Sequence, residues 1–235
     1  MLSRPPTAGL SVRAVSGQTR AVALVLPGGR VRSHARSRPW HLSAVRMIPF
    51  ARSLHVAGAD DGLAVWTVRY RYRGWNGDEA SPVEDVRWAL DEVRSRHGDV
   101  PVALVGHSMG GRTAIRVAGD ASVRTVVALA PWLPPDEPYE GLRGRSVLIL
   151  HGSQDRTTDP AASLALAERA APLASVRRVE IRGDGHPMLR RAALWQGLTS
   201  YFVTSGLDER TDQSSLTMVT NHPYRIPDEG VHLKL

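Results

Sequence analysis

The sequence predicts an α/β fold in which a mostly parallel central sheet is flanked by helices on both faces, giving three layers. Short runs rich in Val, Leu and Ile alternate with helical patterns, which indicates strands that are buried on both faces and joined by crossover helices. The predicted strands cover residues 21–26, 63–70, 102–105, 125–129, 146–150 and 176–181. An antiparallel edge strand is expected over residues 11–15.

Helical patterns fill the intervals between these strands. One helix is expected to begin with Ser81 as N-cap, because Pro82 then occupies the first helical position and Glu84 completes a capping box. Asp159 and Pro160 predict the start of a later helix in a similar way. The other helices are expected over residues 41–54, 109–118 and 188–204, and the helix behind Pro160 over 161–170.

Composition favours one domain with a substantial core. The chain has 235 residues, and 42% of them are hydrophobic. The domain is expected over residues 1–206, followed by an irregular C-terminal tail over 207–235, where the composition becomes polar. There are no cysteines, which excludes disulfides, thiolate zinc sites and a cysteine nucleophile.

The chain is basic, with a formal net charge of +7 and a pI near 10.6. Such a charge suits nucleic-acid binding, but the arginines are spread along the chain and interleaved with Asp and Glu. The first residues lack the apolar stretch of a secretory signal, and no run of about 18 apolar residues occurs. We therefore expect a cytoplasmic protein with neither a nucleic-acid nor a membrane partner, and the oligomeric state stays open.

A candidate nucleophile lies in the segment Gly106–Gly110, which fits the pattern G-x-S-x-G. The segment follows a predicted strand and precedes a predicted helix, which is the setting that this motif requires. The two glycines leave room for a sharp turn that exposes Ser108, and the Met109 N–H is expected to donate to an oxyanion. The alternative is an ordinary glycine-bracketed turn with an incidental serine.

A serine nucleophile needs an imidazole to accept its proton, and the imidazole needs a carboxylate to fix its tautomer. Asp155 follows one predicted strand and His186 follows the next. Because the carboxyl ends of parallel strands meet at one edge of a sheet, these side chains can converge with Ser108. Asp136 and Glu137 are the reserve candidates for the carboxylate.

Two further polar residues near these positions have structural interpretations. His107 directly precedes the candidate nucleophile, and neighbouring residues of such a turn cannot both face the pocket. We therefore expect His107 to pack beside the sheet rather than to act as the base. Asp184 is interpreted as a turn residue of the segment that carries His186.

The second oxyanion donor is expected in the glycine-containing loop after the first central strand. The Gly29 N–H is the preferred donor and the Arg30 N–H the alternative, while an ordinary glycine turn would give neither a role. The loop 30–38 is rich in arginine. It is either simply solvated or attracts an anionic substrate group such as a carboxylate or phosphate, with Arg30 as the candidate contact.

Aromatic residues in the predicted loops either line an acyl pocket or pack without a role in binding. They are Trp40, Trp75, Trp132 and Tyr139. Trp132 is the candidate substrate contact among them.

Four segments together resemble the α/β-hydrolase superfamily. They are Leu-Pro-Gly-Gly at 26–29, Gly-His-Ser-Met-Gly-Gly at 106–111, Leu-His-Gly-Ser-Gln-Asp at 150–155 and Gly-Asp-Gly-His at 183–186. The similarity spans about residues 21–204, and the chain order of serine, aspartate and histidine is also that of the superfamily. Only residues 130–145 stand where large caps are inserted, so the resemblance is to members with little or no lid.

The resemblance implies an α/β-hydrolase fold and a serine esterase or thioesterase. Such an enzyme would cleave a small acyl substrate through an acyl-enzyme, with a triad of Ser108, His186 and Asp155, an oxyanion hole, and neither metal nor organic cofactor. Pro27 departs from the histidine that many members have before the oxyanion glycine. Alternatives are a non-catalytic ligand-binding or scaffold protein on this fold, or a hydrolase of lactone, peptide or carbon–carbon bonds.

Overall fold

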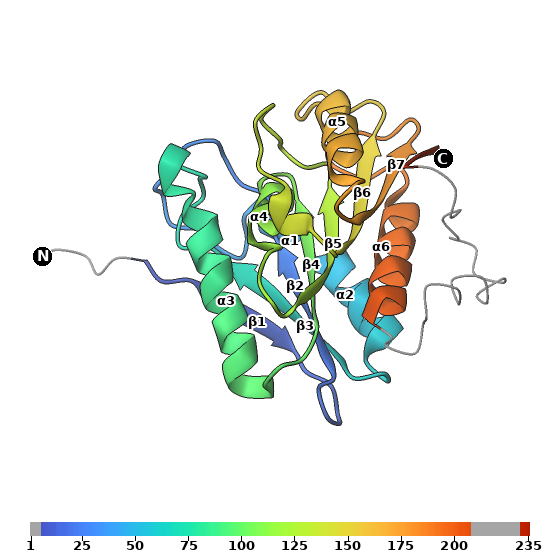
Figure 1. The fold of residues 1–235 in the computed structure, drawn as a ribbon. Helices are drawn as coiled ribbons and strands as arrows, with labels where there is room; N and C mark the ends of the chain where they lie inside the picture. The colour runs from blue at the N-terminus through green and yellow to red at the C-terminus, as the bar shows by residue number, and fades with distance from the viewer. Residues whose placement is uncertain (1–5, 208–230) are drawn as a thin grey trace, which may run out of the picture.

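An eight-stranded sheet forms the centre of the computed structural model, which describes residues 6–207 and 231–235 (Figure 1). The strands are β1 (Gly9–Arg13), β2 (Ala21–Leu26), β3 (Leu63–Arg69), β4 (Val102–His107), β5 (Val123–Leu129), β6 (Ser146–Gly152), β7 (Ser175–Ile181) and β8 (His232–Lys234). Their order in the sheet is β1-β3-β2-β4-β5-β6-β7-β8. β1 is antiparallel to β3, and all other neighbours are parallel.

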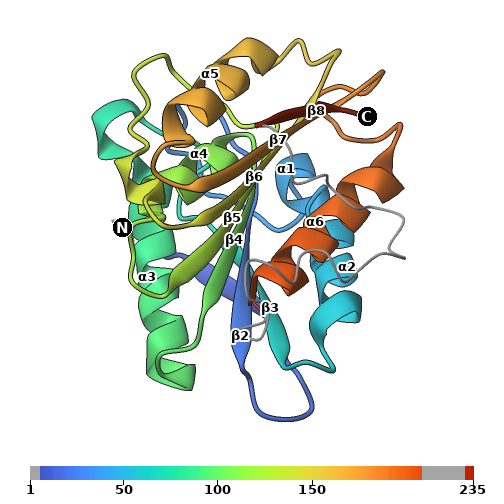
Figure 2. The ribbon, with the colours of Figure 1, turned by 45° about the vertical axis from the view of Figure 1, so that its right-hand side comes forward.

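Helices cover both faces of the sheet (Figure 2). They are α1 (Leu42–Val45), α2 (Ile48–Gly58), α3 (Ser81–His97), α4 (Met109–Val117), α5 (Pro160–Ala170) and α6 (Ala192–Leu207), with 3-10 helices η1 (Gly77–Glu79) and η2 (Glu140–Leu142). α3, α4 and α5 bury their apolar residues on one face, and α2 and α6 on the other. Alternate residues of β2 face opposite cores, as strand geometry requires. The three-layer prediction is therefore confirmed.

No helix in these described ranges has both the length and the apolar character that a bilayer span would need.

The six predicted central strands are confirmed. The antiparallel edge strand is also present, although it covers Gly9–Arg13 rather than residues 11–15. β8 was not predicted, because its sequence has no continuous apolar run. Its His232 accepts a hydrogen bond at Nδ1 from the buried Arg178 of β7 (2.8 Å), and Leu233 pairs with Val179. The remainder of the predicted irregular tail, residues 208–230, lies outside the described residues.

Two predicted helices have different boundaries in the structure. The single helix expected over 41–54 is divided into α1 and α2, because Pro49 stands in the first turn of α2 and has no N–H with which to continue the hydrogen bonds of α1. The last helix begins at Ala192 rather than at 188, because Met188 has a left-handed backbone (φ 58°).

The N-terminus of α3 does not form the predicted capping box. Ser81 is already the first helical residue, and Ala80 before it has a left-handed backbone (φ 42°). The Ser81 hydroxyl donates to Glu79 (3.2 Å), and Glu84 forms an ion pair with an arginine of the loop after β3. These partners compete with capping. The Asp159 cap is confirmed, because its carboxylate accepts a backbone N–H of α5 at 2.8 Å.

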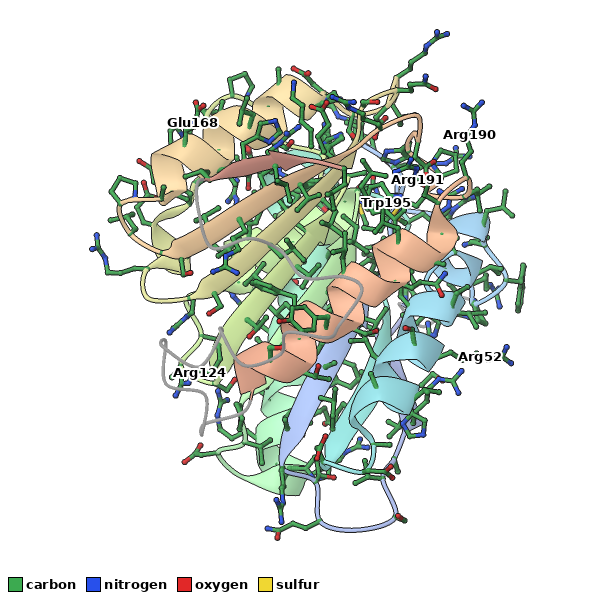
Figure 3. All side chains as sticks on the ribbon, turned by 90° about the vertical axis from the view of Figure 1, so that its right-hand side faces the viewer. Arg52, Arg124, Glu168, Arg190, Arg191 and Trp195 are labelled. Atoms are coloured by element: carbon green, nitrogen blue, oxygen red, sulfur yellow. The ribbon has the colours of Figure 1, made fainter. Side chains whose placement is uncertain are left out.

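The loop between β7 and α6 carries His186 and is held by the buried carboxylate of Asp184. This carboxylate accepts the Trp195 indole N–H (2.9 Å) and the backbone N–H groups of Arg191 (3.0 Å) and Gly185 (2.8 Å). Figure 3 shows Arg191 and Trp195 close together at the beginning of α6. Burial disfavours the charge, but these hydrogen bonds outweigh it and lower the pKa of Asp184. Asp184 is thus a structural turn residue, as expected.

The turn between β4 and α4 requires glycine on both sides of Ser108. A Cβ atom at Gly106 would lie 2.1 Å from the carbonyl oxygen of Gly110. A Cβ atom at Gly110 would lie 2.3 Å from the carbonyl oxygen of Leu26 and 2.6 Å from that of Pro27. Since these neighbours are backbone atoms, they cannot give way without displacing β2 or α4.

We therefore expect Gly110→Ala to destabilise the fold by about 3 kcal/mol or more, because it overpacks the contact between α4 and the end of β2. Gly17→Ala is the matched control: no atom lies within 4 Å of its added Cβ, so its effect should stay within about 0.5 kcal/mol. Urea unfolding measures both. Equal unfolding midpoints for the two variants would contradict the contact.

A second prediction concerns pH. The pKa of Asp184 is lowered on folding, so its charge stabilises the fold above the unfolded-state pKa of about 3.9 and this contribution is lost as pH falls further toward the folded pKa. We expect Asp184→Asn to cost about 1–3 kcal/mol at pH 7, and the difference from the native chain to shrink below about pH 4.

Urea unfolding at pH 7, 5 and 3 measures this difference. The control is Asp60→Asn, which removes an exposed carboxylate. A destabilisation by Asp184→Asn that stays constant with pH would count against the assignment.

Candidate active site

The three candidate catalytic residues follow three strands of the parallel part of the sheet. Ser108 comes directly after β4, Asp155 lies in the turn after β6, and His186 lies in the loop after β7. β5 separates β4 from β6 in the sheet. The residues therefore lie at the carboxyl edge, where open parallel sheets form their ligand crevice.

Ser108 occupies a strained turn. Its φ of 54° and ψ of −116° are unfavourable for a residue with a side chain. The backbone is held by hydrogen bonds from the Ser108 N–H to the Leu129 carbonyl (2.9 Å) and from the N–H groups of Trp132 and Arg112 to the Ser108 carbonyl (both 3.2 Å). Ser108 is partly exposed. The turn thus fixes the backbone while leaving the residue partly exposed.

The Asp155 and His186 side chains meet. Asp155 Oδ2 lies 2.8 Å from His186 Nδ1, and Asp155 Oδ1 accepts the N–H groups of Thr157 (2.7 Å) and Thr158 (3.0 Å). Burial disfavours the carboxylate, but hydrogen bonds from His151, His186 and these two N–H groups hold the pKa of Asp155 well below its usual range. An ionised acceptor places the proton of a neutral His186 on Nδ1, which leaves Nε2 as the basic nitrogen.

No hydrogen bond joins the Ser108 hydroxyl to His186 within the described ranges. The His186 ring is nevertheless next to the turn, because its centroid lies 4.6 Å from that of His107, the residue before Ser108. Catalytic hydrogen bonds are often long in unliganded enzymes and tighten when substrate binds. The structure thus joins Asp155 and His186 directly and places the His186 ring next to the turn that contains Ser108.

Sequence reasoning missed two residues around Asp155. His151 is fully buried, with Nε2 3.3 Å from Asp155 Oδ2, and the Thr158 hydroxyl donates to the same oxygen at 2.8 Å. The spacing of four residues from His151 to Asp155 was the available signal, but His151 belongs to an apolar strand and resembled a core residue. Both side chains help to fix the carboxylate that contacts His186.

His107 packs beside the sheet, as expected. Its ring is buried, and its Nε2 lies 3.1 Å from the backbone oxygen of His186. Burial, and in addition the positive charge of Arg46, lowers the pKa of His107 to about 3. The ring is therefore neutral at pH 7, and its Nε2–H donates to the His186 carbonyl. His107 thus helps to position the loop that carries His186.

The reserve carboxylates lie elsewhere. Glu137 is buried in ion pairs with Arg112 (2.6 Å between Glu137 Oε2 and Arg112 Nε) and Arg116, whereas Asp136 is exposed. Within residues 6–207 and 231–235, neither forms a hydrogen bond with a histidine. Asp155 is therefore the better candidate for the acid.

The loop after β2 lies against the turn at Ser108. A Cβ atom at Gly28 would lie only 3.4 Å from the Ser108 Cβ, and Gly29 is exposed beside it. The Arg30 N–H already donates to the Arg73 carbonyl (2.8 Å), which removes it as a free donor and favours Gly29. Met109 is the first residue of α4, so the helix supplies no acceptor for its N–H.

Two cavities lie near these residues. One, of about 440 Å³, is lined partly by Trp75, Arg112 and Trp132. The Arg112 guanidinium carbon lies 3.8 Å from the Trp75 ring centroid and 4.6 Å from that of Trp132, so this cavity wall is rigidly stacked. The other, of about 350 Å³, is lined partly by Arg30 and Trp40. The two predicted substrate contacts, Arg30 and Trp132, thus face different cavities.

Comparison with known proteins supports the fold assignment. A family model described as "Serine aminopeptidase, S33" matches residues 69–146, which include the turn at Ser108 but neither Asp155 nor His186. Among curated proteins, no significant match is found.

Solved structures with similar folds include three bacterial proteins. An α/β serine hydrolase homologue from Coxiella burnetii has a TM-score of 0.63 at 18% identity, covering 83% of this chain and 90% of that one. Est1E from Butyrivibrio proteoclasticus, solved with ferulic acid, has a TM-score of 0.64 at 13% identity, covering 85% of this chain and 95% of that one. An α/β serine hydrolase without a lid from Xanthomonas campestris has a TM-score of 0.62 at 17% identity, covering 87% of this chain and 91% of that one. Together with the order of the sheet, these similarities show that the chain has the α/β-hydrolase fold, and the match over residues 69–146 is to a family of serine hydrolases with the same turn.

Proposed function

We propose that the protein is a serine hydrolase that cleaves a carboxylic ester or thioester of a small substrate through an acyl-enzyme. One observation carries the proposal. The partly exposed Ser108 occupies a strained turn, the His186 ring lies 4.6 Å from the ring of His107 in the same turn, and the Nδ1 of His186 is bound at 2.8 Å by the buried, ionised Asp155. This is the arrangement that makes an otherwise weak serine nucleophile reactive.

In the first half of the reaction, the Ser108 hydroxyl oxygen attacks the carbonyl carbon while its proton passes to His186 Nε2. The N–H groups of Met109 and Gly29 stabilise the negative charge that forms on the carbonyl oxygen. The bond from the carbonyl carbon to the leaving oxygen or sulfur then breaks, and His186 returns its proton to the leaving alcohol or thiol. The acyl group remains on Ser108, and Asp155 stabilises the transient imidazolium throughout.

Water completes the cycle in the second half. His186 accepts a proton from the water as the water oxygen attacks the acyl carbon, and it then protonates the departing Ser108 oxygen. The net reaction consumes one ester or thioester and one water and yields a carboxylic acid with an alcohol or thiol. The enzyme returns to its starting protonation state, and no step requires electron transfer.

Peptide-type amide hydrolysis is the second candidate, because the family description names a serine aminopeptidase. Ester hydrolysis is favoured because two other structural neighbours are described as an esterase, from Pyrococcus furiosus, and as an acetyl ester-xyloside bifunctional hydrolase, from Caldicellulosiruptor lactoaceticus. Turnover of 4-nitrophenyl butyrate compared with that of aminoacyl 4-nitroanilides separates the two. Faster turnover of the anilides would replace the ester assignment.

The nucleophile is tested with Ser108→Ala. This variant removes the attacking oxygen, so turnover of 4-nitrophenyl butyrate should fall by about 10⁴-fold or more. Intact mass spectrometry should show one fluorophosphonate adduct on the native chain and none on the variant.

Ser16→Ala, at an exposed bend, is the control and should keep both the adduct and the turnover. Undiminished turnover by Ser108→Ala, or labelling of that variant, would refute the proposal.

The acid is tested with Asp155→Asn. The amide cannot hold the His186 tautomer that leaves Nε2 basic, so kcat should fall by roughly 10³- to 10⁴-fold with little change in KM. Asp136→Asn tests the reserve carboxylate and should retain activity. Stopped assays with 4-nitrophenyl butyrate give both constants, and thermal unfolding verifies that each variant is folded. If Asp136→Asn rather than Asp155→Asn were inactive, the assignment would be wrong.

A further inference from the structure

The cavity beside the candidate oxyanion loop has features that ester hydrolysis alone does not explain. It has a volume of about 350 Å³, and the residues that line it include Gly28, Arg30, Trp40, His41 and Arg73. Gly28 approaches Ser108 closely, since a Cβ atom at Gly28 would lie 3.4 Å from the Ser108 Cβ. A molecule in this cavity would therefore lie next to the nucleophile.

The cavity is positively charged and has no countercharge of its own. Arg30 and Arg73 line it, and neither an aspartate nor a glutamate does. Within the described part of the chain, these two side chains make no ion pair, nor does that of Arg38, which stacks on Trp40 at 5.4 Å. The nearby Arg71, by contrast, is paired with a buried carboxylate at 2.5 Å. Unpaired cations close together repel each other unless an anion joins them.

The backbone holds these arginines in place. The N–H of Arg30 donates to the carbonyl of Arg73 (2.8 Å), and the carbonyl of Arg30 accepts the N–H of Trp75 (2.9 Å). The N–H of Arg73 donates to Ala35 (3.0 Å). The two segments follow β2 and β3, which are parallel neighbours, so their connection places both arginines at the same edge as Ser108.

The lowered pKa of His41 is consistent with a positive potential in the cavity. Partial burial, and then the charges of Arg73, Arg38 and Arg30, lower its pKa. Its Nδ1 accepts the backbone N–H of Arg38 (3.1 Å), which leaves the other ring nitrogen as a donor in the neutral form. The indole of Trp40, which is 67% exposed, adds an apolar wall to these donors.

We propose that this cavity binds a negatively charged group of the substrate, a carboxylate or a phosphate, through Arg30 and Arg73, with an apolar part of the substrate against Trp40. The inference rests on the proposed hydrolase function and narrows its substrates to anionic esters or thioesters. Arginine suits this role because its planar guanidinium binds carboxylates and phosphates through two parallel hydrogen bonds. A volume of about 350 Å³ fits a small-molecule group.

The kinetic test compares matched anionic and neutral esters. One pair, 4-nitrophenyl hydrogen adipate and 4-nitrophenyl methyl adipate, places a carboxylate on the acyl side. The other pair, 4-acetoxyphenyl phosphate and 4-methoxyphenyl acetate, places a phosphate on the leaving alcohol. We expect kcat/KM of the native chain to favour the anionic ester by about tenfold or more in at least one pair, because hydrogen bonds between arginine and an anion are stronger than those between neutral groups.

Two glutamine variants assign this preference to the cavity. Arg73→Gln and Arg30→Gln should each reduce the ratio of anionic to neutral kcat/KM about tenfold, whereas Arg73→Lys should restore part of it. Arg52→Gln is the matched control, because Arg52 points into solvent from α2 (Figure 3) and should leave the ratio unchanged. No anionic preference in either pair, or a ratio that survives both glutamine changes, would overturn the inference.

A binding measurement separates this inference from the hydrolase proposal. Isothermal titration calorimetry of Ser108→Ala with adipate and with inorganic phosphate reports anion binding without turnover. Binding of either anion that is lost in the Ser108→Ala, Arg73→Gln double variant supports the anion site even if fluorophosphonate does not label Ser108. Ser108-dependent turnover of neutral esters, with neither anion bound nor anionic esters preferred, would overturn the anion site while leaving the hydrolase proposal intact.

Discussion

The close backbone approach at the β4–α4 turn is the constraint on which the candidate site depends. Gly106 and Gly110 allow the chain to reverse where any Cβ would collide with carbonyl oxygens, and Ser108 between them is held in an unfavourable backbone conformation. Such strain costs on the order of 1–3 kcal/mol. The buried parallel ladder of β2, β4 and β5 offsets this cost, and the hydrogen bond from Ser108 to the Leu129 carbonyl continues the ladder into the turn.

The second requirement is a carboxylate that stays charged although it is buried. The Asp155 carboxylate stays charged because it accepts hydrogen bonds from four donors besides His186. These are the N–H groups of Thr157 and Thr158, the Thr158 hydroxyl and the His151 ring. Each favours the ionised form, and together they outweigh desolvation. The neutral ring of His107 then holds the backbone of the histidine loop. The candidate base is therefore oriented from both its side chain and its main chain.

The arrangement of charge separates structural from candidate binding arginines. Arg71, Arg94 and Arg112 have carboxylate partners, and Arg112 also stacks between two indoles. Arg30 and Arg73 have no such partner in the described part of the chain, yet backbone hydrogen bonds fix the segments that carry them. Folding thus brings two arginines from separate loops to one cavity beside the nucleophile turn.

The sequence by itself determined the central strands, the three-layer class and the turn around Ser108, because these depend on apolar runs and on glycine spacing, which are local. Residue order also pointed to Asp155 and His186, whose contact the structure shows. Only the tertiary structure decided the division of the helix at Pro49, the bonding of Ser81 and the edge strand β8. It also decided the contact of His151 with Asp155 and the hydrogen bond that occupies the Arg30 N–H. Each of these depends on a partner brought close by folding or on a competing local contact, and neither leaves a periodic pattern in the sequence.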